Sequence, residues 1–320
     1  MTLNIHWRLD PAAEPLRSEP GTEHALPAFI RDRRATSRNR FDYYVQVARA
    51  VAQTAFDGLF VRHRSEADES RIIAAIIARE TPRLLVVPEF PASVGSAVYA
   101  AKQAATFQRA THGRLGWAIA AEENAASREA EADFVPDEDL RQRLDEFLTV
   151  ARGVHRDRPF TFQGRHFEVL DGGFEAPLNQ HRFPKLFLQG EDDGALALSA
   201  RHADVHLFAP GPVDVLAERI ATLNTLTAVE GRQVAAGLIQ PLLVREDRDG
   251  AENDVQHLPL ASGTLVASYD EAADQLAAYA AAGVTELLLE AVPTLEEAYR
   301  VGQHLLPRLR ARTGAARKAA

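Results

Sequence analysis

The feature that most constrains the fold of this chain is the alternation of two hydrophobic patterns. Short runs rich in leucine or β-branched residues alternate with longer stretches whose apolar residues recur at helical spacing. The run Gly58–Val61, for example, precedes the stretch Glu69–Arg79, which carries four isoleucines. A regular strand–helix alternation of this kind is typical of parallel βαβ units.

The alternation repeats eight times along the chain. The predicted strands are Leu3–Trp7, Gly58–Val61, Leu84–Val87, Leu115–Ala121, Lys185–Leu188, Val205–Phe208, Ala236–Val244 and Val284–Leu289. The predicted helices are Phe41–Ala55, Glu69–Arg79, Ser96–Ala110, Asp137–Gly153, Ala195–His202, Pro212–Leu226, Ser268–Ala282 and Leu295–Arg312. Eight such units predict a TIM-type (β/α)₈ barrel, a fold that needs about 250 residues as one domain.

Two segments depart from this alternation. Phe160–Val169 reads as a hairpin with Gln163-Gly164 at its turn, within an insertion that spans about 157–183. After Arg245 the sequence is polar and unpatterned where a seventh helix is expected, so we predict a shortened seventh unit. We expect residues 1–312 to form a single domain and 313–320 to form a flexible tail.

Charge and composition exclude several classes of protein. The net charge of −9 argues against a nucleic-acid partner, because phosphate binding requires a concentrated basic face. The chain has no cysteine, which excludes disulfides, thiolate metal sites and a thiol nucleophile. It has neither an 18-residue apolar run nor a signal-peptide pattern at its start, so we expect a soluble, cytoplasmic protein without membrane contact.

Several blocks resemble a known enzyme family. The ending Thr294–Leu309 resembles the final helix of bacterial alkanesulfonate monooxygenases, which belong to the luciferase-like superfamily of flavin-dependent monooxygenases. Leu3–Trp7 is similar to the first strand of that family, and Ser93–Arg114 to its third helix and fourth-strand entry. Gln163–Phe167 resembles its insertion hairpin, and Tyr279–Leu289 its eighth-strand entry.

The resemblance implies both a fold and an activity. It implies a luciferase-like barrel that uses reduced FMN, supplied by a separate flavin reductase, to oxygenate a small organic substrate. It also implies a homo-oligomer, either a dimer or a tetramer. Function is argued separately from fold, because one barrel hosts many chemistries.

The turn that binds the FMN phosphate in the family differs here. The family has a turn resembling Gly-Gly-Ser-Ser at a helix start, whereas this chain has Gln189–Gly194 with three consecutive carboxylates, Glu191-Asp-Asp193. Carboxylates repel a phosphate, and they also cap the following helix. A hard-cation site is the functional alternative to a cap, although we predict no metal site. Gly190 remains as a candidate cofactor contact, and Arg141 aligns with a family tyrosine that touches the phosphate.

Other family positions are also replaced. Ala118 aligns with a strand-four asparagine, and Ala121-Glu122 aligns with a Thr-Gly pair near the flavin. Ile239 and Pro241 stand where the family carries an Arg-x-His pair on strand seven. These replacements indicate a degenerate active site, in which Glu122 is either an acid, base or substrate ligand or a solvated loop carboxylate.

Polar residues at other strand ends are candidates for function. His6 and Arg8 share one face of the first strand and need partners or a ligand if that face is the barrel interior. Arg62-His63-Arg64 directly follows the second strand and could bind an anionic substrate group through Arg62 and Arg64, or be a solvated basic loop.

Aromatic and histidine side chains on other strands have structural alternatives. Trp117 could stack on a flavin ring or pack in the core. His206 is interpreted as a core histidine. His6, Arg8, His63 and Glu122 are the catalytic candidates, but no acid or base is assigned to a step.

Three hypotheses follow. The first is a two-component monooxygenase that depends on reduced flavin. The second is a non-catalytic relative that acts as a binding or partner subunit. The third is a barrel that holds a different anionic ligand through His6, Arg8, Arg62 and Arg64.

Overall fold

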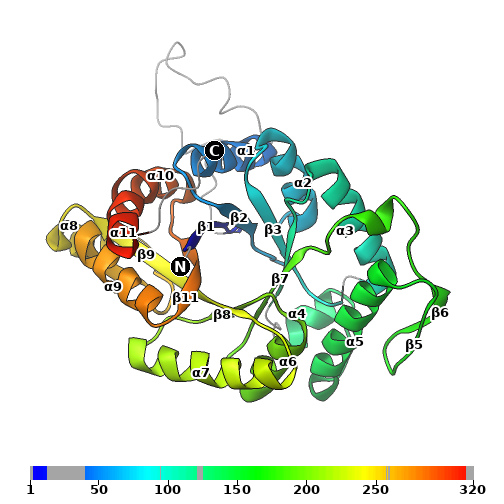
Figure 1. The fold of residues 1–320 in the computed structure, drawn as a ribbon. Helices are drawn as coiled ribbons and strands as arrows, with labels where there is room; N and C mark the ends of the chain where they lie inside the picture. Colours follow the sequence, from blue (N-terminus) through cyan, green and yellow to red (C-terminus); the bar gives the residue numbers. More distant parts are fainter. Residues whose placement is uncertain are drawn as a thin grey trace, which may run out of the picture.

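Eight parallel strands form a closed barrel inside a ring of helices in the computed structural model (Figure 1). The structure describes residues 3–12, 40–93, 95–120, 125–256, 258 and 260–314. The predicted TIM-type (β/α)₈ barrel is therefore confirmed. Glu122 lies outside the described residues.

The barrel strands are β1 Asn4–Leu9, β2 Gly58–Val61, β3 Leu85–Phe90, β4 Gly116–Ile119, β7 Lys185–Gln189, β8 Val205–Phe208, β9 Ala235–Arg245 and β11 Val284–Glu290. Each strand pairs in parallel with the next in this order, and β11 pairs with β1 to close the barrel.

The helices are α1 Arg40–Gln53, α2 Ser70–Glu80, α3 Ala97–Thr111, α4 Ala125–Ala130, α5 Asp137–Arg156, α6 Asp193–His202, α7 Val213–Val229, α8 Arg248–Val255, α9 Tyr269–Ala281, α10 Thr294–Arg300 and α11 Leu306–Thr313. In the described part of the chain no helix is long and apolar enough to cross a membrane.

Alternation of side chains along each strand divides the core into two regions. Inward-facing residues such as Phe60, Phe187 and Leu288 form a small cluster inside the barrel. Outward-facing residues such as Trp7 and Leu59 join the larger cluster between strands and helices. Because all strands are parallel, their carboxyl ends meet at one rim, where sites in this fold are built.

Five strands are longer than the sequence analysis predicted. β1 continues to Leu9, β3 to Phe90, β7 to Gln189 and β11 to Glu290, and β9 is one residue longer at each end. The predictions ended where the apolar runs ended, but the backbone remains paired beyond them. Glu89 and Glu290 therefore belong to strands rather than to loops.

The seventh unit is short, as predicted, but it contains a helix that the prediction left out. α8 begins after Asp247, whose side chain accepts a hydrogen bond from the Gly250 amide at 2.7 Å, and it buries Ala251. A further strand, β10 Leu265–Ser268, then pairs with the end of β9. Pro241 is the last β9 residue paired with β11, and the β9 residues after it pair with β10 instead.

The closing helix is also interrupted. The sequence predicts one helix over 295–312, whereas a wider turn, η3 Val301–Leu305, separates α10 from α11. The Leu306 amide there bonds to the Val301 carbonyl, five residues back. Gly302 packs so closely on Thr54 of the segment after α1 that a side chain at this position would overlap it.

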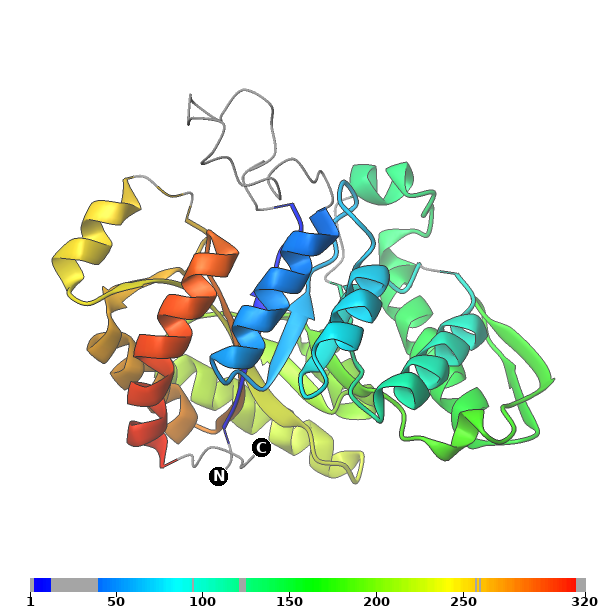
Figure 2. The same ribbon diagram turned by 90° about the horizontal axis from the view of Figure 1, so that it is seen from above.

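The predicted hairpin consists of β5 Phe160–Gln163 and β6 Glu168–Gly172. It lies outside the helical ring next to α5 (Figures 1 and 2). Glu146 of α5 accepts hydrogen bonds from the backbone amides of Arg165, His166 and Phe167 at 2.9, 2.7 and 3.1 Å. This one carboxylate therefore fastens the hairpin turn to the barrel.

Candidate functional site

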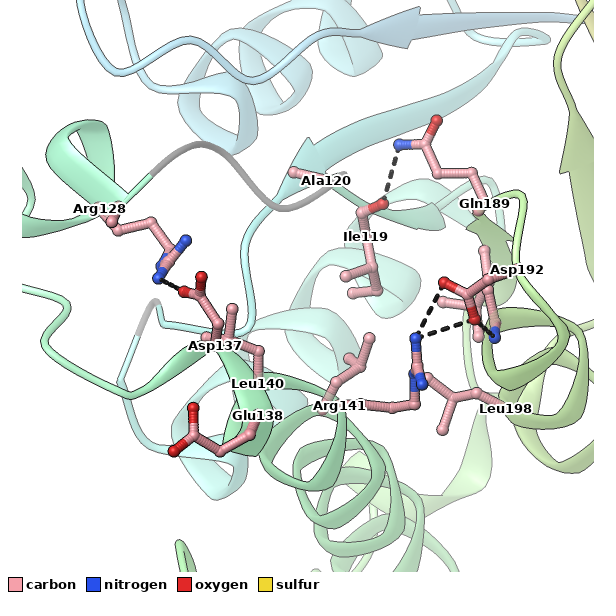
Figure 3. Close-up of a pocket in the computed structure, with 15 residues that line it drawn as sticks. Ile119, Ala120, Arg128, Asp137, Glu138, Leu140, Arg141, Gln189, Asp192 and Leu198 are labelled. Carbon is pink, nitrogen blue, oxygen red and sulfur yellow. Dashed lines mark hydrogen bonds and ion pairs between the residues drawn. The ribbon is translucent and has the colours of Figure 1, made fainter.

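A cavity of about 680 Å³ opens at the carboxyl ends of β4 and β7 (Figure 3). Its other walls are the first turns of α5 and α6 and part of α4. The lining residues are Ile119, Ala120, Ala125, Arg128, Asp137, Glu138, Leu140, Arg141, Leu144, Leu188, Gln189, Gly190, Asp192, Ala195 and Leu198. Its volume lies within the range of small-molecule and cofactor sites.

Two of the three predicted cofactor contacts line this cavity, and the third does not. Arg141 and Gly190 belong to its wall, whereas Trp117 faces the outer side of the barrel. The Trp117 ring contacts Phe90 and Phe183 at centroid distances of 5.2 and 5.1 Å. Its position fits the core-packing interpretation.

Arg141 and Asp192 form an ion pair at the start of α6 (Figure 3). Arg141 Nη2 donates to both carboxylate oxygens of Asp192 at 2.9 Å, and Asp192 Oδ1 accepts from the Ala195 amide at 2.9 Å. The bond from the Ala195 amide and the Arg141 charge hold the pKa of Asp192 below its usual value, against a smaller opposing effect of burial. Asp192 is thus the N-cap of α6, as the capping interpretation predicted.

The second ion pair of the cavity lies on its opposite side. Arg128 bonds to Asp137 in the first turn of α5, where Glu138 supplies another carboxylate (Figure 3). The described part of the lining thus carries three carboxylates and two guanidinium groups, and both guanidinium groups are paired with a lining carboxylate.

The consecutive carboxylates Glu191 and Asp192 after β7 accept hydrogen bonds from different amides. Glu191 accepts a hydrogen bond from the Ala209 amide at 3.1 Å, away from the Asp192 cap. Among the described residues no group of three or more histidine, aspartate or glutamate side chains is arranged to hold a metal ion.

A buried ionic cluster occupies the rim at the ends of β1, β3 and β11. Arg8 Nη2 donates to Glu89 Oε2 at 2.6 Å and Nη1 to Glu290 Oε2 at 3.4 Å. Burial lowers the pKa of Arg8, but the charges of Glu89 and Glu290 outweigh it and raise this pKa above its ordinary value. Arg8 and His6 share one face of β1, as alternation predicted, and that face is the barrel interior, where the charge of Arg8 is compensated.

Asp10 organises the neighbouring basic residues. Arg64 donates to Asp10 through Nε at 3.1 Å and through Nη2 at 2.5 Å, whereas Arg62 Nη1 lies 3.4 Å from the same carboxylate. Burial lowers the pKa of Arg62, and Arg8 and Arg64 lower it further. Arg62 therefore has the weaker hold on Asp10, and a bound anion would favour its charged form.

The two candidate histidines lie apart from each other. His6 Nε2 lies 2.7 Å from Glu286 Oε2, next to the amino end of β11, and its ring contacts Phe60 and Phe187. His63 Nε2 lies 3.6 Å from Glu131 Oε2, beyond the end of β2. His6 therefore lies toward the amino ends of the strands, and His63 lies at the opposite rim, where the carboxyl ends meet.

Sequence reasoning missed Asp10, Glu89 and Glu290, the acidic partners of the rim. Glu89 continues the inward-facing series of Leu85 and Val87, and Glu290 lies two residues after inward-facing Leu288. A charged residue two positions beyond an inward-facing apolar residue was the available signal. It was lost because the strands were ended at their last apolar residue.

Known proteins resemble this chain in sequence pattern and in fold. Residues 23–264 match the luciferase-like monooxygenase family. Riboflavin lyase RcaE, solved with a modified FMN and the substrate riboflavin, superposes with a TM-score of 0.82 at 15% identity, covering 99% of this chain and 93% of its own.

Two monooxygenases show the same similarity of fold. EDTA monooxygenase EmoA from Chelativorans sp. BNC1 has a TM-score of 0.77 at 14% identity and covers 99% of both chains. Long-chain alkane monooxygenase LadA has a TM-score of 0.80 at 14% identity, covering 100% of this chain and 93% of its own.

The family match extends over more than half of the chain, and the matched segment contains every described lining residue of the cavity. The closed barrel described above agrees with the folds of these solved structures. This chain belongs to the luciferase-like monooxygenase family, whose members are flavin-dependent oxidoreductases.

Proposed function

We propose that this protein is the oxygenase component of a two-component monooxygenase that uses reduced flavin and acts on a small organic substrate. Family membership supports the reaction class, and the cavity at the ends of β4 and β7 carries the proposal because it offers a site of suitable volume at the functional rim. A reduced flavin would supply the electrons that allow one atom of O₂ to enter the substrate while the other leaves as water.

The cavity wall offers apolar surface against which the ring system of a flavin could pack. The side chains of Ile119, Leu188 and Leu198 form apolar surface, and the Gln189 amide, which donates to the Ile119 carbonyl at 3.3 Å, lies on the same rim. These groups would orient the ligand and exclude water from it.

FMN, the cofactor that the resemblance implies, fits this cavity poorly at its phosphate. The phosphate-binding turn of the family corresponds to the start of α6, where Asp192 already accepts the Ala195 amide and holds Arg141. A phosphate would lose those donors to Asp192 and be repelled by its carboxylate. No step is therefore assigned to FMN itself.

We propose Arg62 as the contact for an anionic group of the substrate. Its side chain is 31% exposed, lies on the rim and is held only at 3.4 Å by Asp10, which leaves donors for a ligand. Arg64, the other candidate, is bound through two nitrogens to Asp10 and would position that carboxylate instead.

Partners and setting follow from the same proposal. A separate flavin reductase would supply the reduced cofactor, and we place both proteins in the cytoplasm, a reducing compartment that suits a chain without cysteine. We further propose a homo-oligomer, either a dimer or a tetramer. The exposed Ile72 and Ile76 of α2 and Tyr99 of α3 provide apolar surface for it. Residues 1–312 would act as one domain.

Anaerobic binding and reoxidation test the proposal. We expect the protein to bind dithionite-reduced riboflavin or FMN with a micromolar Kd, measured by absorbance and fluorescence. Mixing the complex with O₂ in a stopped-flow instrument should give reoxidation kinetics different from those of free flavin, because the site excludes water. Failure of both flavins to bind at about 1 mM, which corresponds to about 4 kcal/mol, would rule out a flavin enzyme.

A second candidate function is a non-catalytic barrel that acts as a binding or partner subunit. Three replacements at the rim favour it: inward-facing Ala118, Ile239 and buried Pro241 offer neither a charge nor a side-chain hydrogen bond. The binding measurement above separates the two candidates, since this one requires no flavin.

A further inference from the structure

The start of α6 contains its own anion. The Asp192 carboxylate accepts the Ala195 amide at 2.9 Å and both hydrogen bonds from Arg141 Nη2 at 2.9 Å. A phosphate monoester would need the same two kinds of donor, an amide at a helix start and a guanidinium group. The internal carboxylate therefore occupies the position at which a phosphate would be stabilised.

Two glycines build this arrangement into the backbone. The Arg141 guanidinium lies so close to Gly194 that any side chain at this position would overlap it. Gly190 has a φ of +139°, and a Cβ there would lie 2.5 Å from the Ala195 Cβ. The turn is therefore packed tightly against the first turn of α6, and Arg141 is held across that turn.

The remaining charged residues of the cavity also disfavour a bound phosphate. Asp137 and Glu138 lie in the first turn of α5, so the second positive helix end at the cavity is also provided with carboxylates. Arg128 is already paired with Asp137. Among the described lining residues a dianionic phosphate would meet three carboxylates and no unpaired guanidinium, whereas hydroxyl groups could donate to those carboxylates.

We infer that this cavity selects a flavin whose side chain ends in a neutral hydroxyl group, the riboflavin class, over phosphorylated FMN. The inference rests on the proposed function, because it specifies which flavin the same site takes. Asp192 is the selecting residue and Arg141 holds its carboxylate in place.

Calorimetric titration with riboflavin and with FMN tests this selection. We expect the wild-type protein to bind riboflavin at least tenfold more tightly than FMN at low salt. Asp192→Asn should raise FMN affinity at least fivefold and leave riboflavin affinity within twofold, because asparagine retains the N-cap but removes the charge. Raising the salt concentration should reduce the difference between the affinities of the wild-type protein for riboflavin and for FMN, because salt screens the repulsion between charges.

Asp193→Asn is the matched control. Asp193 lies one residue further along the same helix end but does not line the cavity, so this variant should leave both affinities unchanged. Thermal melting and circular dichroism of each variant check that α6 still forms.

Each outcome has a defined consequence. FMN binding as tightly as riboflavin, or an unchanged preference in Asp192→Asn, overturns the selection while the protein remains a flavin enzyme. Equal effects of Asp192→Asn and Asp193→Asn also overturn it, because the change would then reflect net charge alone. Binding of neither flavin overturns both the selection and the proposed function.

Discussion

His206 shows how one buried residue couples stability to pH. It lies on the outer face of β8, fully buried, and its Nδ1 is 2.7 Å from Ser199 Oγ of α6. Burial lowers its pKa to about 4, with a smaller contribution from the Arg219 charge. The folded protein therefore keeps this ring neutral over a pH range in which the unfolded chain protonates it.

We predict that His206→Gln reduces the loss of stability on acidification. Because the folded pKa is depressed from 6.5 to about 4, the wild-type protein loses stability as pH falls through that interval. The contribution of His206 between pH 7 and pH 5 is about 2 kcal/mol. Urea denaturation at both pH values measures it, with the exposed His304→Gln as control. Equal pH dependence in wild type and His206→Gln would contradict the prediction.

At the scale of elements, the insertion hairpin depends on a helix carboxylate. Glu146 of α5 accepts three consecutive amides of the β5–β6 turn. Burial raises its pKa, but those amide bonds outweigh the effect and lower the pKa below its usual value. Gly164 is required beside it, because a side chain there would overlap the carboxylate. A helix and a hairpin far apart in sequence are thus joined by one group.

We predict that Glu146→Gln loosens the hairpin and leaves the barrel folded. Glutamine retains one acceptor oxygen but lacks the charge, so at least one amide loses its partner, at a cost of about 1–3 kcal/mol. Hydrogen exchange of the Arg165, His166 and Phe167 amides should accelerate, whereas exchange in β1 and β2 should not. The exposed Glu168→Gln on β6 is the control and should leave exchange at the turn unchanged.

At the scale of the whole molecule, a polar cluster closes the amino end of the barrel. Glu286 of β11 accepts hydrogen bonds from Asn4 of β1 and from Lys185 of β7 at 2.7 and 2.5 Å, and its other oxygen meets His6. Although burial raises the pKa of Glu286, His6 and Lys185 outweigh it and lower that pKa to about 2. The cluster connects strands across the barrel, so its loss affects the entire fold.

We predict that Glu286 contributes to acid stability over the whole barrel. Its depressed pKa means that its stabilisation is present above pH 4.5 and is lost as pH falls toward 2. Between pH 5 and pH 3 this loss is about 2 kcal/mol. Glu286→Gln should lower the melting temperature at pH 7, because His6 and Lys185 lose their charged partner. It should also reduce the loss of stability between pH 5 and pH 3. A variant whose stability falls with acidification as much as that of the wild type would exclude this role. Glu218→Gln, at an exposed position of α7, is the control.

The sequence by itself determined the architecture and the family. Eight strand runs that alternate with helices predicted the barrel. Such an alternation gives a parallel sheet, and the apolar faces of its strands must be buried against helices or inside a closed sheet. Local chemistry could be predicted as well: Asp192 caps α6, as its position after β7 indicated, and alternation placed His6 and Arg8 on one common face of β1. These properties depend on residues near one another in the chain.

Only the tertiary structure decided which charges meet. Arg141 of α5 pairs with Asp192 at the start of α6, and Arg8 of β1 pairs with Glu89 and Glu290 of two other strands. The structure also decided that Trp117 packs in the outer core. Sequence spacing could not predict these pairings, because they join positions separated by 51 to 282 residues that only barrel closure brings together. The strength of an ionic contact depends on distance and burial, and both are properties of the closed fold.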